Sequence, residues 1–324
     1  MILNLKTTAL AAALMGAALG VNAQTVTLKV HHFLGPQSVQ HTTMLGEWCK
    51  NLARDSKDRL KCDIFPAMQL GGTPPQLYEQ ARDGVIDVAW TLQAYTPKLA
   101  KLEVFELPFM MTNAEATSRA AWDFAQKYAQ DDFKDVKMLA VHVHGPGNIY
   151  SKSKAVITMA DLKGMKVRAP TRQVNKMVAM MGATPVAMPV PQVPEALSKG
   201  VIDGAVIPYE VAPGLKVNEL TNFTAETDRS YNALYTTVFV VPMNKAKYDS
   251  LPADLKAVID KNSGRELSAF MGQKISVIPK TELEKWKKAT DSLDDAWVAE
   301  MTGKGFDGKG MLQTASDLIK QYTK

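Results

Sequence analysis

The sequence predicts an α/β fold in two lobes, and three observations support this prediction. Segments with the apolar spacing of strands alternate with segments that have the spacing of helices, which is typical of mostly parallel sheets covered by helices. The chain has 324 residues, more than a single hydrophobic core usually holds. A segment of sixteen residues also has a second, similar copy in a distant part of the chain.

The first residues have the order that is typical of an export signal. Lys6 precedes an apolar run over residues 7–20, and small residues at 21–23 precede Gln24. The run is shorter than the roughly 20 residues that a membrane-spanning helix needs. We therefore expect an exported protein whose signal peptide, residues 1–23, is cleaved after Ala23.

The charge balance argues against a nucleic-acid-binding protein. The sequence has 38 Lys and Arg residues against 33 Asp and Glu residues, a formal net charge of +5. Because both signs are interspersed along the chain, no strongly basic surface is predicted.

The two cysteines, Cys49 and Cys62, flank a short segment. In an oxidising compartment they can form a disulfide, and the alternative is a pair of buried free thiols. Neither is expected to be catalytic, because no basic partner that would activate a thiolate stands nearby.

The predicted elements follow in order along the chain. The first strand alternates apolar and polar residues before a Gly35-Pro36 break. Strands are predicted at 26–32, 60–65, 85–92, 137–144 and 165–169, and helices at 44–53, 76–82 and 174–181. Gly182 closes the last of these helices. After about residue 245 the spacing becomes helical, so we expect long C-terminal helices that brace both lobes; their apolar positions include Leu255, Val258, Ile259, Leu283, Trp286, Trp297, Leu312, Leu318 and Ile319.

The internal repeat aligns residues 75–90 with residues 191–206 without gaps, and eight of the sixteen positions are identical. Each copy is expected to form a helix, a Gly at its C-terminal end and then a strand. Two distant copies do not make a solenoid, which needs adjacent units, so they indicate two lobes of the same plan.

Sequence signatures of enzymes are mostly absent, since there is no nucleophile elbow, phosphate loop or dinucleotide fingerprint. His142 and His144 lie two apart on a predicted strand, so their imidazoles could share a metal ion. No third ligand stands at a supporting spacing, and we favour a polar role at the edge of a cleft. No cofactor is expected.

Arg168 is the strongest candidate for ligand binding. A short strand delivers it to a C-terminal sheet edge, where ligands of open α/β sheets bind, and Thr171 can cap the following helix. A guanidinium makes two parallel hydrogen bonds to a carboxylate, and a helix N-terminus adds attraction for an anion. The alternative is a solvated surface arginine, which fits Arg172 better than Arg168.

Several motifs together resemble the solute-binding subunit of tripartite ATP-independent periplasmic (TRAP) transporters, the DctP type. The similarity extends from Leu28 to about residue 265. It is carried by Asp-Leu-Lys-Gly-Met-Lys-Val-Arg-Ala-Pro at 161–170, Met-Gln-Leu-Gly-Gly at 68–72, Gly-Val-Ile-Asp at 84–87 and Leu-Pro-Phe at 107–109.

The resemblance implies a two-lobed, periplasmic-binding-protein-like α/β fold with a central cleft, crossing strands and a long helix. Lobe I is expected at 24–145, completed by about 233–272, and lobe II at 146–232, completed by about 273–324. The family binds organic acids in the periplasm, performs no catalysis and delivers its ligand to membrane permease subunits. Its carboxylate-clamping arginine corresponds to Arg168. A monomer is expected.

This chain departs from the members that bind sugar acids. Gly147 or Asn148 stands where many members have a second arginine, which leaves one main cation and favours a monocarboxylate. The predicted pocket loops are apolar, so an aromatic or branched 2-oxo or 2-hydroxy acid is expected. The apolar positions are Phe33, Leu92, Tyr95, Val190, Ile207 and Tyr209. The predicted ligand-binding set is Arg168, His32, Phe33, Gln93, Tyr95, His144, Asn148, Thr171, Arg172, Ile207, Tyr209 and Glu210.

Two other functions fit the same scaffold. One is an exported enzyme in which His142 or His144 is a general base near Arg168. The other is a sensor whose closed form signals to a membrane receptor. Sequence alone does not separate a sensor from a transport protein.

Overall fold

The structure is a computed structural model that describes residues 25–228, 230–272, 292 and 295–314. The chain divides into two compact units, Met1–Lys274 and Ile275–Lys324. In the second unit, residues 295–303 and 308–314 are helical. The predicted signal peptide and the apolar positions Leu283, Trp286, Leu318 and Ile319 lie outside the described residues. Among the residues described, none of the helices combines the length and apolar character that crossing a membrane requires.

The first sheet is mixed and has strand order β2-β1-β3-β11-β4, with β5 also paired to β11. β1 is parallel to β2 and β3, whereas β11 is antiparallel to β3, β4 and β5. These strands are β1 (Val26–His31), β2 (Leu60–Phe65), β3 (Val88–Ala89), β4 (Thr91–Leu92), β5 (Val136–Val143) and β11 (Val238–Asn244).

The second sheet has order β10-β6-β9-β7-β8, with β7 parallel to β8 and β9. β6 is antiparallel to β9 and β10. Its strands are β6 (Gly147–Ser151), β7 (Lys166–Ala169), β8 (Thr184–Ala187), β9 (Gly204–Pro208) and β10 (Phe223–Ala225). The chain therefore enters this sheet between β5 and β6 and returns to the first sheet between β10 and β11.

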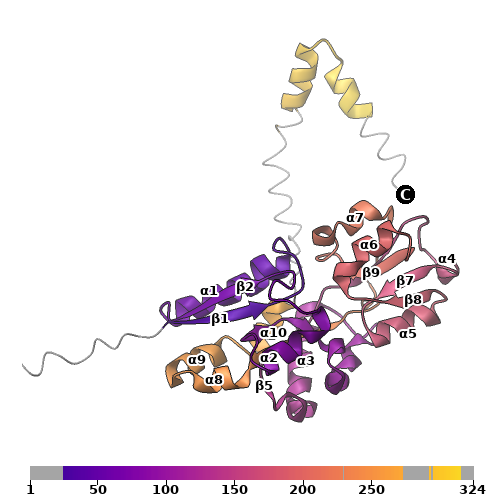
Figure 1. The fold of residues 1–324 in the computed structure, drawn as a ribbon. Helices are drawn as coiled ribbons and strands as arrows, with labels where there is room; N and C mark the ends of the chain where they lie inside the picture. Colours follow the sequence, from indigo (N-terminus) through magenta and orange to yellow (C-terminus); the bar gives the residue numbers. More distant parts are fainter. Residues whose placement is uncertain (1–24, 229, 273–291, 293–294, 315–324) are drawn as a thin grey trace, which may run out of the picture. The chain divides into compact units, whose positions relative to one another are not determined.

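Helices cover both sheets, and Figure 1 shows α4 to α7 gathered around the second one. The α-helices are α1 (Gly46–Asp55), α2 (Leu77–Arg82), α3 (Ala114–Tyr128), α4 (Met159–Leu162), α5 (Arg172–Met180), α6 (Val193–Ser198), α7 (Val217–Leu220), α8 (Lys245–Ser250), α9 (Ala253–Lys261) and α10 (Arg265–Met271). A π-helix, η1 (Gln40–Leu45), leads directly into α1. The 3₁₀ segments are η2 (Pro74–Gln76), η3 (Gln93–Tyr95), η4 (Pro97–Glu106), η5 (Gln130–Phe133), η6 (Val190–Gln192) and η7 (Pro213–Leu215).

The predicted α/β fold with two sheets is confirmed, and one hydrophobic cluster connects the sheets. It contains Phe33, Trp90 and Phe239 from the first sheet and its loops together with Val190 and Ile207 from the second. The two sheets thus meet through apolar and aromatic side chains. The exact lobe boundaries given above stay predictions.

The internal repeat is a structural repeat. In each copy a 3₁₀ turn leads into a short helix, and a Gly with positive φ follows, Gly84 at +78° and Gly200 at +68°. The Asp87 carboxylate then accepts the backbone N–H of Lys29 in β1, and that of Asp203 accepts the N–H of Lys166 in β7, both at 2.8 Å. The shared Asp therefore ties each helix-to-strand connection to the neighbouring parallel strand.

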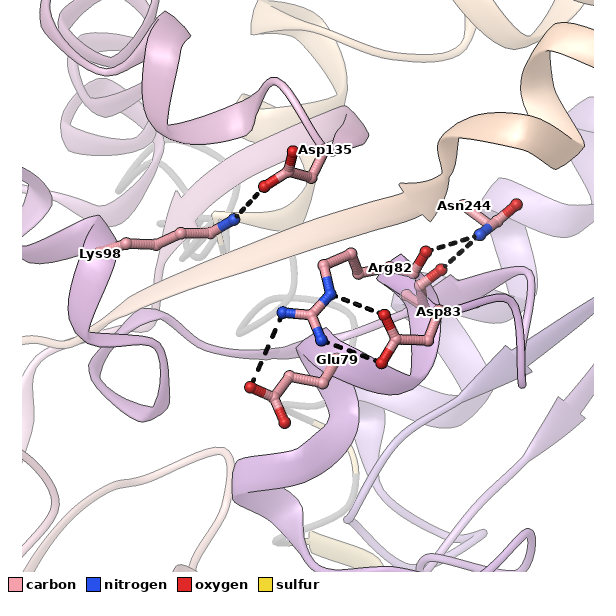
Figure 2. A network of polar contacts seen from close by, with 7 residues as sticks. Glu79, Arg82, Asp83, Lys98, Asp135 and Asn244 are labelled. Atoms are coloured by element: carbon pink, nitrogen blue, oxygen red, sulfur yellow. Dashed lines mark hydrogen bonds and ion pairs between the residues drawn. The ribbon is translucent and has the colours of Figure 1, made fainter.

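Asn244, at the end of β11, joins this strand to the helices α2 and α8. Its side-chain N–H groups donate to the carbonyl oxygens of Ala81 and Arg82 at the C-terminus of α2, as Figure 2 shows. Its side-chain oxygen accepts the N–H of Lys247 and caps α8. Nearby, the Arg82 guanidinium makes a two-pronged contact with Asp83.

The predicted strand at 85–92 is shorter in the structure. β3 begins at Val88, and Val85 is 58% exposed. The N–H groups of Val85 and Ile86 both donate to the carbonyl of Gln80, so this stretch still closes α2. Local hydrogen bonds that close the C-terminus of α2 thus take the place of the strand pairing that the apolar run predicts for residues 85–87.

Cys49 of α1 and Cys62 of β2 form a disulfide, with their Cα atoms 5.8 Å apart. This result decides between the two alternatives left open by the sequence. The bridge fastens α1 to the parallel strand next to β1.

Candidate functional site

Two neighbouring cavities lie where elements of the two sheets meet. The smaller has a volume of about 30 Å³ and contains Arg168 in its wall, and the larger has a volume of about 310 Å³. They share the wall residues Trp90, His144, Val211 and Phe239. A cavity of the smaller size has room for a small polar group, whereas ligand pockets start near 300 Å³.

Arg168 reaches the smaller cavity from the C-terminal part of β7, as the sequence predicts. It is 3% exposed, its Nε donates to the carbonyl of Met188 at 3.0 Å, and its Nη1 donates to that of Val206 at 3.3 Å. No carboxylate lies within ion-pair distance of it among the described residues. Burial lowers the pKa of Arg168. A buried cation with only carbonyl partners favours the arrival of an anion.

Two phenols lie beside this cation. Tyr95 and Tyr235 line the smaller cavity, and within the described part of the chain neither hydroxyl has a hydrogen-bond partner although both oxygens are buried. Burial raises the pKa of both phenols, and the Arg168 charge opposes part of that rise. Both therefore keep their protons at neutral pH and can donate them to an anion.

Stacked aromatic rings form the wall that both cavities share. The ring of Trp90 stacks on Phe239 with centroids 4.4 Å apart and an interplanar angle of 6°. Phe33 stacks on the same indole at 5.1 Å, and Tyr95 lies edge-on to Phe33 at 6.5 Å. Such a wall suits the flat apolar body of an aromatic ligand.

His142 is held as a neutral imidazole. Its Nε2 accepts the indole N–H of Trp90 at 2.9 Å, and its Nδ1 lies 3.3 Å from the carbonyl oxygen of Val143. Both ring nitrogens are thus engaged, and burial lowers the pKa to about 3. A lone pair for a metal ion or for general-base catalysis is therefore lacking. The described residues hold no cluster of three or more side chains that could bind a metal ion.

His144 differs because one of its nitrogens has no partner. Its Nδ1 lies 2.5 Å from the carbonyl of Gly145, which places the proton on that nitrogen. Nε2 makes no hydrogen bond with the described residues, and the ring lines both cavities. Burial lowers the pKa of His144 to about 4, and the charge of Arg168 acts in the same direction.

The cavities bring together part of the predicted ligand-binding set. Phe33, Tyr95, His144, Arg168 and Ile207 line the smaller cavity, and His144 and Glu210 line the larger one. Of the apolar loop positions, Leu92 and Val190 also belong to the smaller cavity.

Three other predicted residues are buried outside the cavity walls. His32 contacts the Nδ1 atom of His41 through its Nε2 at 2.9 Å and lies edge-on to Trp90. Gln93 donates to the carbonyl of Leu99 at 2.9 Å, and Asn148 donates to that of Pro146 at 3.3 Å. His32 thus contacts a wall residue, and none of the three lines either cavity itself.

The remaining three do not line either cavity. Thr171 caps α5 by accepting the N–H of Val174, as predicted. Arg172 is exposed and pairs with Glu103, and the half-exposed Tyr209 donates its hydroxyl to Glu226 at 3.1 Å.

Sequence reasoning missed several wall residues. Phe239 and Tyr235 belong to an apolar stretch that is typical of ordinary core, and Trp90 ends a repeat copy within the predicted strand at 85–92, where burial is expected. Gln40 and Thr43 come from the π-helix η1, which no local pattern indicates. These side chains reach a cavity wall only because segments that are far apart in the sequence come together in the fold.

Residues 30–293 match the family described as bacterial extracellular solute-binding protein, family 7. The chain belongs to this family. It is therefore a DctP-type solute-binding protein of the TRAP transporters, as its motifs predict. Members of the family are transport proteins that bind small organic acids outside the cytoplasm and work with membrane permease subunits.

Solved structures of TRAP solute-binding proteins share its two-lobed fold. One from Rhodoferax ferrireducens, with copurified benzoate, is 48% identical, with a TM-score of 0.76 over 92% of this chain and 98% of that one. One from a marine metagenome, with 3-hydroxybenzoate, is 43% identical, with a TM-score of 0.74 over 93% and 100% of the chains. One from Bordetella bronchiseptica, with (R)- and (S)-mandelate, is 26% identical, with a TM-score of 0.70 over 91% and 99%.

Proposed function

We propose that this protein captures an aromatic monocarboxylate in the periplasm and delivers it to a membrane permease without chemical turnover. Arg168 is the carboxylate partner, and Tyr95 and Tyr235 donate further hydrogen bonds to the same group. The observation that carries this proposal is the buried guanidinium beside two buried phenols that have no partner within the described residues.

The electrostatics favour a single carboxylate. A buried arginine without an anion is costly, and an ionised ligand offsets that cost through two parallel charge-assisted hydrogen bonds. The phenol oxygens lose water on burial, so each gains a hydrogen bond when a carboxylate arrives. Three donors around one anion give both affinity and orientation.

The shape of the site favours an aromatic body. The cavity beside Arg168 holds only about 30 Å³, which suits a carboxylate but not a ring. The larger cavity of about 310 Å³ shares the stacked wall of Trp90 and Phe239 and can receive the ring. The similar proteins that carry benzoate, 3-hydroxybenzoate and mandelate support the same ligand class.

Cleft closure is the mechanism that we expect. Arg168 and Ile207 belong to strands of the second sheet, whereas Trp90 and Phe239 belong to the first sheet and its connections. A ligand that contacts both groups stabilises the conformation in which they are close, by the difference in contacts between the open and closed states. The permease would then receive the closed, loaded form.

Calorimetric titration of the mature protein with benzoate and 3-hydroxybenzoate tests the proposal. Arg168→Ala should weaken binding at least about 30-fold, since truncating one partner of a buried charge pair costs about 2–5 kcal/mol. Arg168→Lys should weaken it at least about tenfold, because an ammonium lacks the planar pair of donors.

Arg54→Ala is the matched control, since the Arg54 side chain is 68% exposed and pairs with the neighbouring Asp55. It should leave affinity unchanged. Wild-type affinity in Arg168→Ala, or failure of all aromatic acids to bind, would refute the proposed function.

A further inference from the structure

The wall of the larger cavity includes a buried amide oxygen that has no hydrogen-bond partner in the part of the chain that the structure describes. Gln40, from η1, is 5% exposed, and its side-chain oxygen is buried without a hydrogen bond. Leaving a buried acceptor unpaired is unfavourable, because the oxygen has lost its water without gaining a donor. An unpaired amide in the wall of a ligand-sized cavity indicates a polar group on the ligand.

A fixed carboxylate lies in the same wall. Glu210 follows β9, and its Oε1 accepts the N–H of Gly145 at 2.8 Å. The carboxylate lies flat against this glycine, because a Cβ on Gly145 would approach Oε2 to 3.1 Å and Oε1 to 3.3 Å. Burial raises the pKa of Glu210, whereas the donated backbone N–H of Gly145 stabilises its ionised form. In that form the carboxylate only accepts hydrogen bonds, so Glu210 offers a positioned acceptor.

His144 adds a third acceptor. Because its proton lies on Nδ1, toward the carbonyl of Gly145, the lone pair of Nε2 remains for another donor. The ring borders the Arg168 cavity and the larger cavity at once. The acceptors therefore lie beyond the arginine, on the side where the ligand ring would extend.

We propose that Gln40, Glu210 and His144 form a distal subsite that selects a hydrogen-bond-donating substituent, hydroxyl or amino, on the ring of the bound acid and excludes a second carboxylate. This inference rests on the proposed function. Arg168 is the one Lys or Arg among the described residues that line either cavity. A second carboxylate would therefore meet the ionised Glu210 without a cation to neutralise it, and an unpaired like-charge contact inside a protein disfavours binding.

Matched ligand pairs test the subsite by calorimetry. The pairs are 3-hydroxybenzoate with 3-methylbenzoate and 4-hydroxybenzoate with 4-methylbenzoate, since each methyl group fills the volume of the hydroxyl but cannot donate. For the ring position that binds more tightly, the wild type should prefer hydroxyl over methyl at least about tenfold. The two benzene dicarboxylates with the same geometry should bind at least about 100-fold more weakly than benzoate.

Two variants assign these preferences to residues. Gln40→Met removes the amide at similar length and should lower the hydroxyl-to-methyl ratio at least about threefold. Glu210→Gln keeps an acceptor for Gly145 but removes the charge, so the affinity for the dicarboxylate should rise at least about tenfold relative to benzoate. The exposed controls Gln130→Met and Glu195→Gln should leave both ratios at the wild-type value.

The outcomes separate this inference from the proposed function. Benzoate binding that depends on Arg168, together with ratios that stay within twofold of wild type in both variants, overturns the subsite alone. A wild type that binds dicarboxylates as tightly as benzoate also overturns it, whether or not the variants fold. If benzoate fails to bind the wild type, or binds equally to Arg168→Ala, both proposals fail.

Discussion

Trp90 donates its indole N–H to Nε2 of His142 at 2.9 Å, and this buried hydrogen bond fixes both the plane of the aromatic wall and the tautomer of the histidine. The ring of Phe239 stacks on both residues. The wall is thus a preformed surface before any ligand arrives.

Breaking that hydrogen bond should destabilise the fold. Trp90→Phe keeps an aromatic ring but leaves Nε2 of His142 without a donor, so we expect a loss of about 1–3 kcal/mol in the free energy of unfolding. Urea denaturation measures this loss. Trp297→Phe is the control, because Trp297 is 37% exposed and should change stability by less than about 0.5 kcal/mol. Equal effects of the two substitutions would contradict a structural role for the Trp90 N–H.

Acidification should destabilise the protein through its buried histidines. Burial lowers the pKa of His32 and of His142 to about 3 and that of His144 to about 4. The unfolded chain binds protons below pH 6.5, whereas the folded protein does not until pH falls to these values, so stability is lost as pH decreases through this window. His142 alone should account for a loss of about 3 kcal/mol in the free energy of unfolding as pH falls from 6.5 to 4.

His142→Gln tests this assignment, since the amide oxygen can still accept the Trp90 N–H and does not titrate in this range. The free energy of unfolding of the variant should fall less steeply with acid than that of wild type. If the free energies of unfolding of the two proteins fell in parallel between pH 6.5 and 4, His142 would not be responsible for the loss of stability in acid.

Glu106 should have the opposite effect. Burial raises its pKa to about 7, against the hydrogen bonds from Thr171 and from the backbone N–H of Val238. A carboxyl whose folded pKa lies above its unfolded value favours folding while protonated, so its contribution is lost as pH rises from 4.5 to about 7. Between pH 4.5 and about 7, the free energy of unfolding of Glu106→Gln should therefore rise relative to that of wild type by on the order of 3 kcal/mol. Urea denaturation at several pH values measures this change. If the difference in the free energy of unfolding between the variant and wild type did not change with pH, the raised pKa of Glu106 would be contradicted.

The disulfide should contribute measurably to stability. Cys49 and Cys62 are 13 residues apart, and a loop of this size is worth about 3 kcal/mol in the chain-entropy model. The double variant Cys49→Ala/Cys62→Ala should therefore lower the free energy of unfolding by about that amount. A reducing agent should destabilise wild type similarly and leave the double variant unaffected, and any effect on the variant would point to another cause.

Local chemistry made much of the fold predictable. The strand at 60–65 was predicted with the residues that the structure has, and Thr171 and Gly182 mark the start and end of α5. The repeat indicated two units of one plan because the same Gly and Asp perform the same backbone functions in both. These patterns depend on residues within one element or in neighbouring elements, so the sequence alone predicts them.

The sequence by itself determined the α/β class, the family and the place of Arg168 at the end of its strand. Only the tertiary structure decided which apolar residues form walls and which form core, because Phe239, Tyr235 and Gln40 reach the cavities through contacts between segments far apart in the chain. It also decided that His142 is neutral and engaged whereas His144 keeps a lone pair, since the protonation of a buried imidazole depends on its neighbours in space.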